Sequence, residues 1–187
     1  MLLSVDFYGE LLGETTAAPG KILFILPAIL DEYRITFDFY VSNYRNAWQG
    51  LFRVSNSTHP HTKPGTRAPS VNFNHMKLYV YYENGGKFPW IAKNEDLKAL
   101  KWYNVELKQT YANDKWIFQF FLDGELLHKD ILNQGPNTYT NVEVSAVNIE
   151  PAPPAAKVRN VKVWTSEGNV NFLKCSIGHC SKLDTHV

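Results

Sequence analysis

Hydrophobic and polar side chains alternate along several short stretches of the chain, most regularly between Asp31 and Ser42. In this stretch every odd-numbered residue from Tyr33 to Val41 is hydrophobic. The even-numbered residues between them are mostly polar or charged. A period of two residues is typical of a β-strand that buries one face and exposes the other. The stretch therefore predicts a half-buried strand.

Three successive strands are predicted between residues 102 and 130. In the first, Val105 and Leu107 share one face and polar residues occupy the other. Asp123 and Gly124 separate the second strand from the third, and both residue types tolerate the positive φ of a tight hairpin turn. Aromatic and β-branched residues dominate the run, which favours strands over a helix. The hydrophobic face of the second strand comprises Trp116, Phe118, Phe120 and Leu122.

Shorter patterns predict further strands and loops. Residues 15–20 form a predicted loop, and residues 94–100 a helical turn. Residues 56–70, which have no periodicity and contain three prolines, form a long surface loop. About a dozen strands with closely spaced turn signals predict an all-β fold, a two-sheet antiparallel sandwich. The remaining predicted strands are residues 2–12, 21–27, 31–42, 48–55, 71–74, 77–83, 88–91, 138–149 and 158–164.

The run from Trp102 resembles the core of laminin-G-like and pentraxin-like modules of the concanavalin-A-like jelly-roll superfamily. A family strand of the form Trp-x-x-Val-x-Leu is matched here by Trp102, Val105 and Leu107. The resemblance extends more loosely to residues 32–40 and 156–164. The family's following hairpin is matched by Phe118, Phe120 or Phe121, Asp123 and Gly124.

This resemblance, over roughly residues 20–165, implies a jelly roll whose first and last strands lie side by side. Because β-sandwiches of this size often form one core, we expect a single domain over residues 1–187. Its C-terminal tail would begin at about residue 166. The fold itself implies no particular function, since many functions share it.

Composition and charge argue against several classes of partner and location. A formal net charge of +1 and a pI near 7.8 give no dominant attraction to nucleic acid or to an anionic membrane. The most apolar segment, residues 22–30, is too short to cross a bilayer. The first ten residues lack the features of a signal peptide. We therefore expect a cytoplasmic protein or a mature secreted domain with an added Met, and the family resemblance and the cysteines favour the secreted one.

Two features bear on that location. Cys175 and Cys180 enclose four residues, and a disulfide between them would pin the tail locally. Free thiols and a metal site that adds His179 are the alternatives. An Asn-Ser-Thr sequon begins at Asn56, which is a candidate glycan acceptor if the protein is secreted.

Patterns for catalysis and for metal binding are weak. The sequence contains no strand of alternating acids of the glucanase type and no Gly-x-Ser-x-Gly elbow. We expect no enzyme activity and no cofactor. Calcium is an alternative, although its candidate ligands are mostly amides, and loop histidines offer a weaker alternative for zinc. The calcium candidates are Asn43, Asn46, Asn72, Asn74, Glu83 and Asn84, and the histidines are His59, His61 and His75.

Aromatic and polar side chains combine on the polar faces of two predicted strands, at residues 31–42 and 77–83. A sugar ring stacks on an aromatic face while its hydroxyl groups bond to Asp, Asn and Arg. The alternative is an outer sheet face that carries tyrosines without any binding role, which is common because Tyr has high strand propensity. The loop 56–70, with the nearby Trp48, Arg53 and Asn84, is a second candidate location. The candidate ligand-binding residues are Arg34, Asp38, Tyr40, Arg53, Asn72, Tyr79, Tyr81 and Glu83.

These observations predict a non-catalytic, lectin-like extracellular module that binds a carbohydrate or a glycosylated matrix partner. The alternative is a structural or adhesive module without a sugar site, which binds protein through sheet edges or assembles into a homo-oligomer. Neither nucleic acid nor membrane insertion is expected. If the sheet face is the sugar site, replacing Asp38 by Ala removes binding without unfolding the protein.

Overall fold

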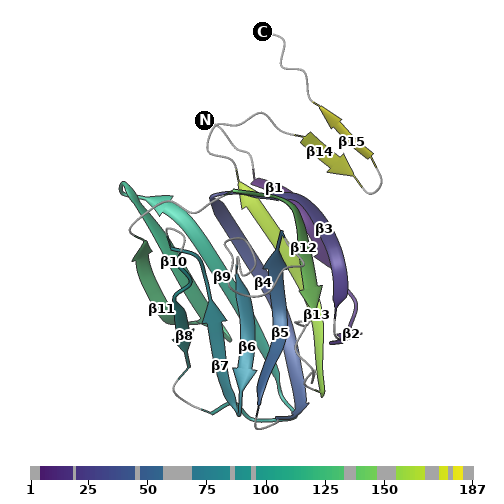
Figure 1. The fold of residues 1–187 in the computed structure, drawn as a ribbon, viewed down its shortest axis with the longest axis vertical. Helices are drawn as coiled ribbons and strands as arrows, with labels where there is room; N and C mark the ends of the chain where they lie inside the picture. The colour runs from purple at the N-terminus through teal and green to yellow at the C-terminus, as the bar shows by residue number, and fades with distance from the viewer. Residues whose placement is uncertain are drawn as a thin grey trace.

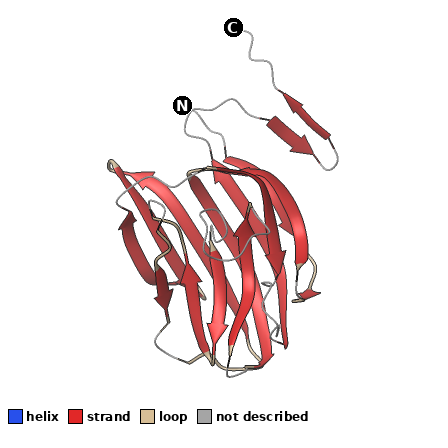
Figure 2. Ribbon diagram, viewed as in Figure 1, coloured by secondary structure: helices blue, strands red, loops and turns tan. Residues whose placement is uncertain are grey.

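The structure is a computed structural model that describes residues 5–18, 20–44, 47–56, 69–84, 87–93, 96–132, 138–146, 155–166, 173–176 and 179–182. Two antiparallel sheets pack face to face in a sandwich (Figure 1). Every described element is a strand, a turn or a loop (Figure 2). The all-β, two-sheet antiparallel fold predicted from the sequence is confirmed.

The seven-stranded sheet has β1 at one edge and β11 at the other. The short strand β2 also pairs with β13 in this sheet. Pairing of β1 with β13 brings the first strand beside the last strand of the sandwich, as the family resemblance implied. The path of the sheet is β1 (Val5–Leu11), β13 (Ala155–Ser166), β4 (Glu32–Asn43), β9 (Trp102–Ala112), β10 (Lys115–Leu122) and β11 (Glu125–Leu132), with β2 at Thr15–Thr16.

The six-stranded sheet has β3 and β8 at its edges. Three of its strands, β6, β7 and β8, are short and follow one another in sequence, so each pairs with the next. The path of the sheet is β3 (Lys21–Ile29), β12 (Tyr139–Ala146), β5 (Trp48–Ser55), β6 (Ser70–Asn74), β7 (Lys77–Tyr81) and β8 (Trp90–Ala92).

The predicted run of three strands is confirmed as β9, β10 and β11. Asp123 and Gly124 have φ values of 51° and 81°, so both adopt the left-handed conformation expected of a primed hairpin turn. The turn from β9 to β10 uses the same conformation at Asn113 and Asp114. Asn and Asp tolerate this backbone better than other non-glycine residues do. Turn chemistry therefore sets the register of this half of the sheet.

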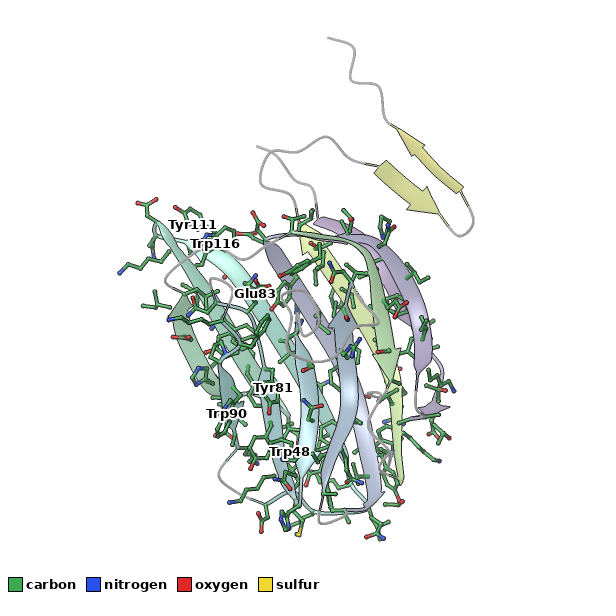
Figure 3. The ribbon with its side chains drawn as sticks, viewed as in Figure 1. Trp48, Tyr81, Glu83, Trp90, Tyr111 and Trp116 are labelled. Carbon is green, nitrogen blue, oxygen red and sulfur yellow. The ribbon has the colours of Figure 1, made fainter. Side chains whose placement is uncertain are left out.

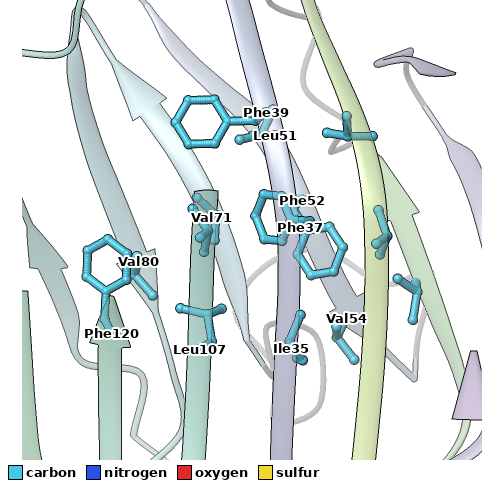
Figure 4. Packing of buried hydrophobic residues seen from close by; sticks show 14 of the residues in the cluster. Ile35, Phe37, Phe39, Leu51, Phe52, Val54, Val71, Val80, Leu107 and Phe120 are labelled. Carbon is cyan, nitrogen blue, oxygen red and sulfur yellow. The ribbon is translucent and has the colours of Figure 1, made fainter. Parts of the chain in front are cut away.

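Aromatic rings from the two sheets meet in the core (Figure 4). Phe37 of β4 stacks on Phe52 of β5 with ring centroids 4.4 Å apart, and Phe39 meets Phe73 at 5.4 Å. All four side chains are fully buried. Burial of a side chain of this size contributes about 1.5–3 kcal/mol. The alternation predicted for residues 31–42 therefore places the core face of the sheet correctly.

Two local expectations need correction. Thr15 and Thr16 form a strand rather than part of a loop, because they pair with Val158 and Lys157 of β13. Described residues 96–100 end in a turn and contain no helical turn.

The predicted tail contains a hairpin of β14 (Leu173–Ser176) and β15 (His179–Lys182). No helix in the described part of the chain has the length and apolar character needed to span a membrane.

Candidate functional site

Three large aromatic side chains gather on the outer face of the six-stranded sheet. Trp48 of β5 meets Tyr79 of β7 with ring centroids 4.6 Å apart, and Tyr79 meets Trp90 of β8 at 5.5 Å. The two Trp side chains are 43% and 58% exposed. Figure 3 shows Trp48, Trp90 and Tyr81 in the same region of the sheet. We call Trp48, Tyr79 and Trp90 the aromatic platform.

Strand register explains why these rings meet. Trp48 and Tyr79 lie on strands that are separated by β6, where Asn74 is opposite Trp48 and Asn72 is opposite Tyr79. Outward-facing asparagines are short, so the larger rings reach one another above β6 and Asn72 is only 7% exposed. Large exposed apolar surface of this kind usually marks a binding site.

Polar groups lie next to the platform. In one row across the sheet, Arg53, Ser70, Tyr81 and Trp90 are successive cross-strand neighbours. Arg53 is buried and donates a hydrogen bond from Nη2 to Ser55 Oγ at 3.1 Å. Tyr81 is half-buried. Four of the predicted ligand-binding residues, Arg53, Asn72, Tyr79 and Tyr81, thus share this face.

The other predicted residues do not belong to the same surface. Arg34, Asp38 and Tyr40 lie on β4, on the outer face of the seven-stranded sheet, whereas Tyr79 and Tyr81 lie on the other sheet. The expectation of one polar face that combines both strands is therefore wrong. Alternation along a strand distinguishes its two faces, but it does not tell which strands share a sheet.

On the seven-stranded sheet the polar groups bond to one another. Asp38 Oδ1 accepts a hydrogen bond from Asn104 Nδ2 at 2.8 Å, and Oδ2 accepts bonds from Asn160 Nδ2 at 2.8 Å and Arg159 Nε at 3.2 Å. The Arg159 guanidinium lies 3.9 Å from the centre of the Trp102 ring. Both oxygens of Asp38 are thus occupied by the fold itself.

Arg34 and Tyr40 are similarly engaged. Arg34 donates two hydrogen bonds to Glu106, at 2.7 and 3.0 Å, and Tyr40 packs beside Trp102 with ring centroids 5.5 Å apart. A shallow cavity of about 260 Å³ lies next to Arg34, between Trp164 and Lys108. This face is dominated by internal ion pairs rather than by exposed aromatic rings.

Glu83 is buried in the sandwich and is not part of an exposed site. Its side chain is 3% exposed, and Oε2 accepts a hydrogen bond from the Tyr139 hydroxyl. Burial raises the pKa of Tyr33, and the negative charge of Glu83 raises it further. In Figure 3 Glu83 lies away from Trp48 and Trp90. Its prediction as a ligand-binding residue is therefore wrong, because it belongs to a buried hydrogen-bonded group.

The described residues contain no group of three or more His, Cys, Asp or Glu side chains placed to hold a metal ion. Among the calcium candidates, Asn72 lies under the platform and Asn43 is at the end of β4. His75 is exposed in the turn between β6 and β7, with φ of 55°. Asn46, His59 and His61 lie outside the described residues.

The remaining predicted sites concern modification. Cys175 is directly opposite Cys180 in the pairing of β14 with β15, and their disulfide stays a prediction. Asn56 is exposed immediately after β5, and the other two sequon positions lie outside the described residues.

Sequence reasoning missed Trp90 and placed Trp48 only near the loop 56–70. Trp90 is on β8, which has three residues and is too short to show a period of two. Trp48 begins β5, where every following residue is buried, so this strand shows no alternation. The signal that was present is the recurrence of Trp and Tyr at solvent-facing positions of neighbouring strands, at Trp48, Tyr79, Tyr81 and Trp90.

No protein-family model matches the chain, and no curated protein sequence matches it. Solved structures do share its fold. The receptor-binding domain of botulinum neurotoxin type G matches with a TM-score of 0.53 and 10% identity, over 84% of this chain and 44% of that one. A leech intramolecular trans-sialidase complexed with 2,7-anhydro-Neu5Ac matches with a TM-score of 0.53 and 17% identity, over 88% of this chain and 29% of that one.

An endo-β-1,4-glucuronan lyase from the fungus Trichoderma reesei matches with a TM-score of 0.50 and 12% identity, over 87% of both chains. This chain spans less than half the length of the toxin domain and of the trans-sialidase. At such identities the likeness shows the fold alone. Because the fold serves both binding domains and enzymes, function must be inferred from the site.

Proposed function

We propose that the protein is a non-catalytic carbohydrate-binding module and that the aromatic platform is its binding surface. The observation that carries this proposal is the row of Trp48, Tyr79 and Trp90, whose rings contact one another on an exposed sheet face. The C–H groups on one face of a sugar ring are apolar and pack on an aromatic ring. Tyr and Trp also offer a polar O–H or N–H at the ring edge.

The neighbouring polar groups supply the other half of sugar recognition. A ring stacked on the platform presents its hydroxyl groups to the sides, where Asn74 is the cross-strand neighbour of Trp48 and Tyr81 that of Trp90. Asn and Tyr each act as both donor and acceptor, as sugar hydroxyls do. An open row of rings suits a glycan chain better than a compact apolar ligand, which is usually enclosed in a deep pocket.

The similar structures support this proposal and also suggest its main alternative, an enzyme that cleaves polysaccharides. A receptor-binding domain and an enzyme complexed with a sialic-acid derivative share the fold, but so does a glucuronan lyase. Hydrolysis of a glycosidic bond usually needs two carboxylates across the substrate. Strands β5, β6, β7 and β8, which carry the platform, contain no Asp or Glu. These strands therefore lack the acids of a hydrolase, whereas a lyase cleaves by elimination without such a pair and is distinguished from a binding module by the cleavage test below.

We infer that the glycan belongs to an extracellular partner. Two features support this location, namely the alignment of Cys175 with Cys180 across the β14–β15 hairpin and the exposure of Asn56 in its sequon. A disulfide and a glycan both form in secretory compartments. The concanavalin-A-like relationship implied by the sequence remains part of this proposal.

The proposal is tested with a glycan array, run with calcium and again with a chelator, followed by titration of the best ligand. Trp90→Ala should weaken binding of that ligand about tenfold or more, since truncating an aromatic anchor of a binding site typically costs this much. The variant should fold, because Trp90 is on an edge strand and 58% exposed. The control Tyr111→Ala removes an aromatic ring of similar exposure, 49%, from the other sheet.

The outcomes distinguish the alternatives. Ligand affinity that is unchanged in Trp90→Ala but lost in Tyr111→Ala would move the site to the seven-stranded sheet. Binding that disappears with the chelator would assign calcium a role at the Asn-rich turns. Cleavage of the bound polysaccharide would make the protein an enzyme. No glycan binding, together with concentration-dependent oligomers, would favour the structural or adhesive module.

A further inference from the structure

The strands that carry the aromatic platform have an unusual distribution of charge. Arg53 on β5 and Lys77 on β7 are their only charged side chains, and both are cationic. On the outer face of the other sheet, in contrast, several cations are paired with acids. Lys162 pairs with Glu10 at 2.9 Å, and Arg159 pairs with Asp38 at 3.2 Å. Positive charge on the platform face is therefore not matched by acids within its own four strands.

Lys77 stands immediately beside the platform. It lies two residues before Tyr79 on β7, so its side chain leaves the same face of the sheet at a spacing of about 6–7 Å. Across the sheet it is opposite Asn74, which is in turn opposite Trp48. Lys77 is exposed, and its ammonium group makes no ion pair or hydrogen bond with the residues that the structure describes.

No described acid forms an ion pair with Lys77. Asp96 lies near it, because the N–H of the adjacent Leu97 donates to Met76 O at 2.8 Å, but no ion pair joins Asp96 to Lys77. Glu83 follows β7 in sequence, but it is buried and bonded to Tyr139. Glu143 of β12 is opposite Ser55, at the other end of β5 from Trp48. An ammonium group without an acidic partner at the edge of a stacking surface attracts an anionic group of a bound ligand. Arg53, which is buried beneath the same face, adds positive potential there.

From this arrangement we propose that the platform selects acidic glycans, with a sugar carboxylate bound by Lys77 while the sugar rings of the chain stack on Trp48, Tyr79 and Trp90. This inference rests on the proposed function and specifies its ligand class. The carboxylate of a uronic or sialic acid projects from the ring edge, so the ring face stays available for stacking. Neutral glycans of the same linkage would keep the stacking and lose the ionic contact.

The experiment compares acidic polysaccharides with their own neutral forms. Polygalacturonate, alginate and glucuronan oligosaccharides are each prepared natively and after chemical reduction of the carboxyl groups, which leaves linkage and length unchanged. Affinities are measured by calorimetry at low and at high salt. At least one native oligosaccharide should bind about two- to fivefold tighter than its reduced form, the gain that one exposed ion pair gives. High salt should narrow this difference.

Two lysine variants test whether Lys77 causes the preference for the native, acidic form. Lys77→Gln keeps a polar side chain, one atom shorter, and removes its charge. It should lower the preference for the native form to about one. Lys108→Gln is the matched control, because Lys108 is on the outer face of the other sheet, at β9. Its preference should equal that of the wild type. Retention of the full preference in Lys77→Gln would overturn the inference.

The remaining outcomes separate this inference from the proposed function. Equal affinity for native and reduced forms, with loss of both in Trp90→Ala, would confirm glycan binding and refute the selection of acidic glycans. Tighter binding of the reduced form would also refute the selection of acidic glycans. Failure of every native and reduced form to bind would refute both proposals together.

Discussion

The Asp38→Ala variant distinguishes most directly which of the two sheets carries the sugar site. In the structure Asp38 is a structural acceptor. It binds Asn104, Asn160 and Arg159, and its side chain is 18% exposed. The two amide donors contribute about 0.5–1.5 kcal/mol each. The ion pair with the half-exposed Arg159 adds about 0.5 kcal/mol. The variant should therefore lose about 2 kcal/mol of unfolding free energy while its sugar affinity stays unchanged.

Urea denaturation and calorimetry measure the loss. For a chain of this size, 2 kcal/mol corresponds to a decrease in Tm of about 4–8 °C. Asp96→Ala is the control, since Asp96 is exposed and no hydrogen bond or ion pair joins it to the described residues. It should change stability by less than about 0.5 kcal/mol. Asn160 has φ of 51°, a backbone conformation that Gly also adopts, so Asn160→Gly removes the amide without straining the backbone. In a double-mutant cycle with Asp38→Ala, the coupling energy between Asp38 and Asn160 should be about 0.5–1 kcal/mol.

Two results would refute this reasoning in different places. A folded Asp38→Ala protein with wild-type stability would show that the hydrogen-bonded network contributes nothing. A variant that folds normally but no longer binds the glycan would place the site on the seven-stranded sheet, as the sequence alone had suggested. Binding that follows Trp90 and not Asp38 would place it on the platform.

Two further predictions concern stability. Tyr82→Phe should lower the unfolding free energy by about 1.5–3 kcal/mol in urea denaturation, because the hydroxyl donates to Asp130 Oδ2 at 2.6 Å; a loss below 0.5 kcal/mol would contradict this. Burial acts to raise the pKa of Asp123, but the Asn104 N–H and the Lys101 ammonium outweigh it and hold that pKa below its usual value. The advantage of wild type over Asp123→Asn should therefore be present above about pH 4 and vanish as pH falls through the folded-state pKa, whereas an advantage independent of pH would exclude this cause.

The sequence predicted the elements whose conformation depends mainly on residues adjacent in the chain. Alternation identified β4, and its hydrophobic residues are the buried ones. Asp123 and Gly124 identified a turn, because the backbone conformation that a primed turn needs restricts the residues that fit. Short strands were predicted less well. β2 has two residues, too few for a period to appear, and it exists only because β13 pairs with it.

The candidate site was predicted only in part, because it depends on which strands are neighbours. Tyr79 and Tyr81 were recognised as surface aromatics, and the structure leaves them on the surface. Glu83 continues the same alternation beyond β7, yet it is buried and bonded to Tyr139, which is 56 residues away. Distant pairing of this kind leaves no periodic signal in the sequence.

The sequence by itself thus determined the longer strands with clear alternation, their buried faces and the hairpin turns, since these depend on local backbone preference and on the burial of apolar side chains. Only the tertiary structure decided which polar faces belong together. Strand order places β4 in one sheet and β7 in the other, and cross-strand register brings Trp48, Tyr79 and Trp90 into contact. Pairing between strands distant in sequence is set by packing of the whole core, so the platform emerges only when the two sheets have formed.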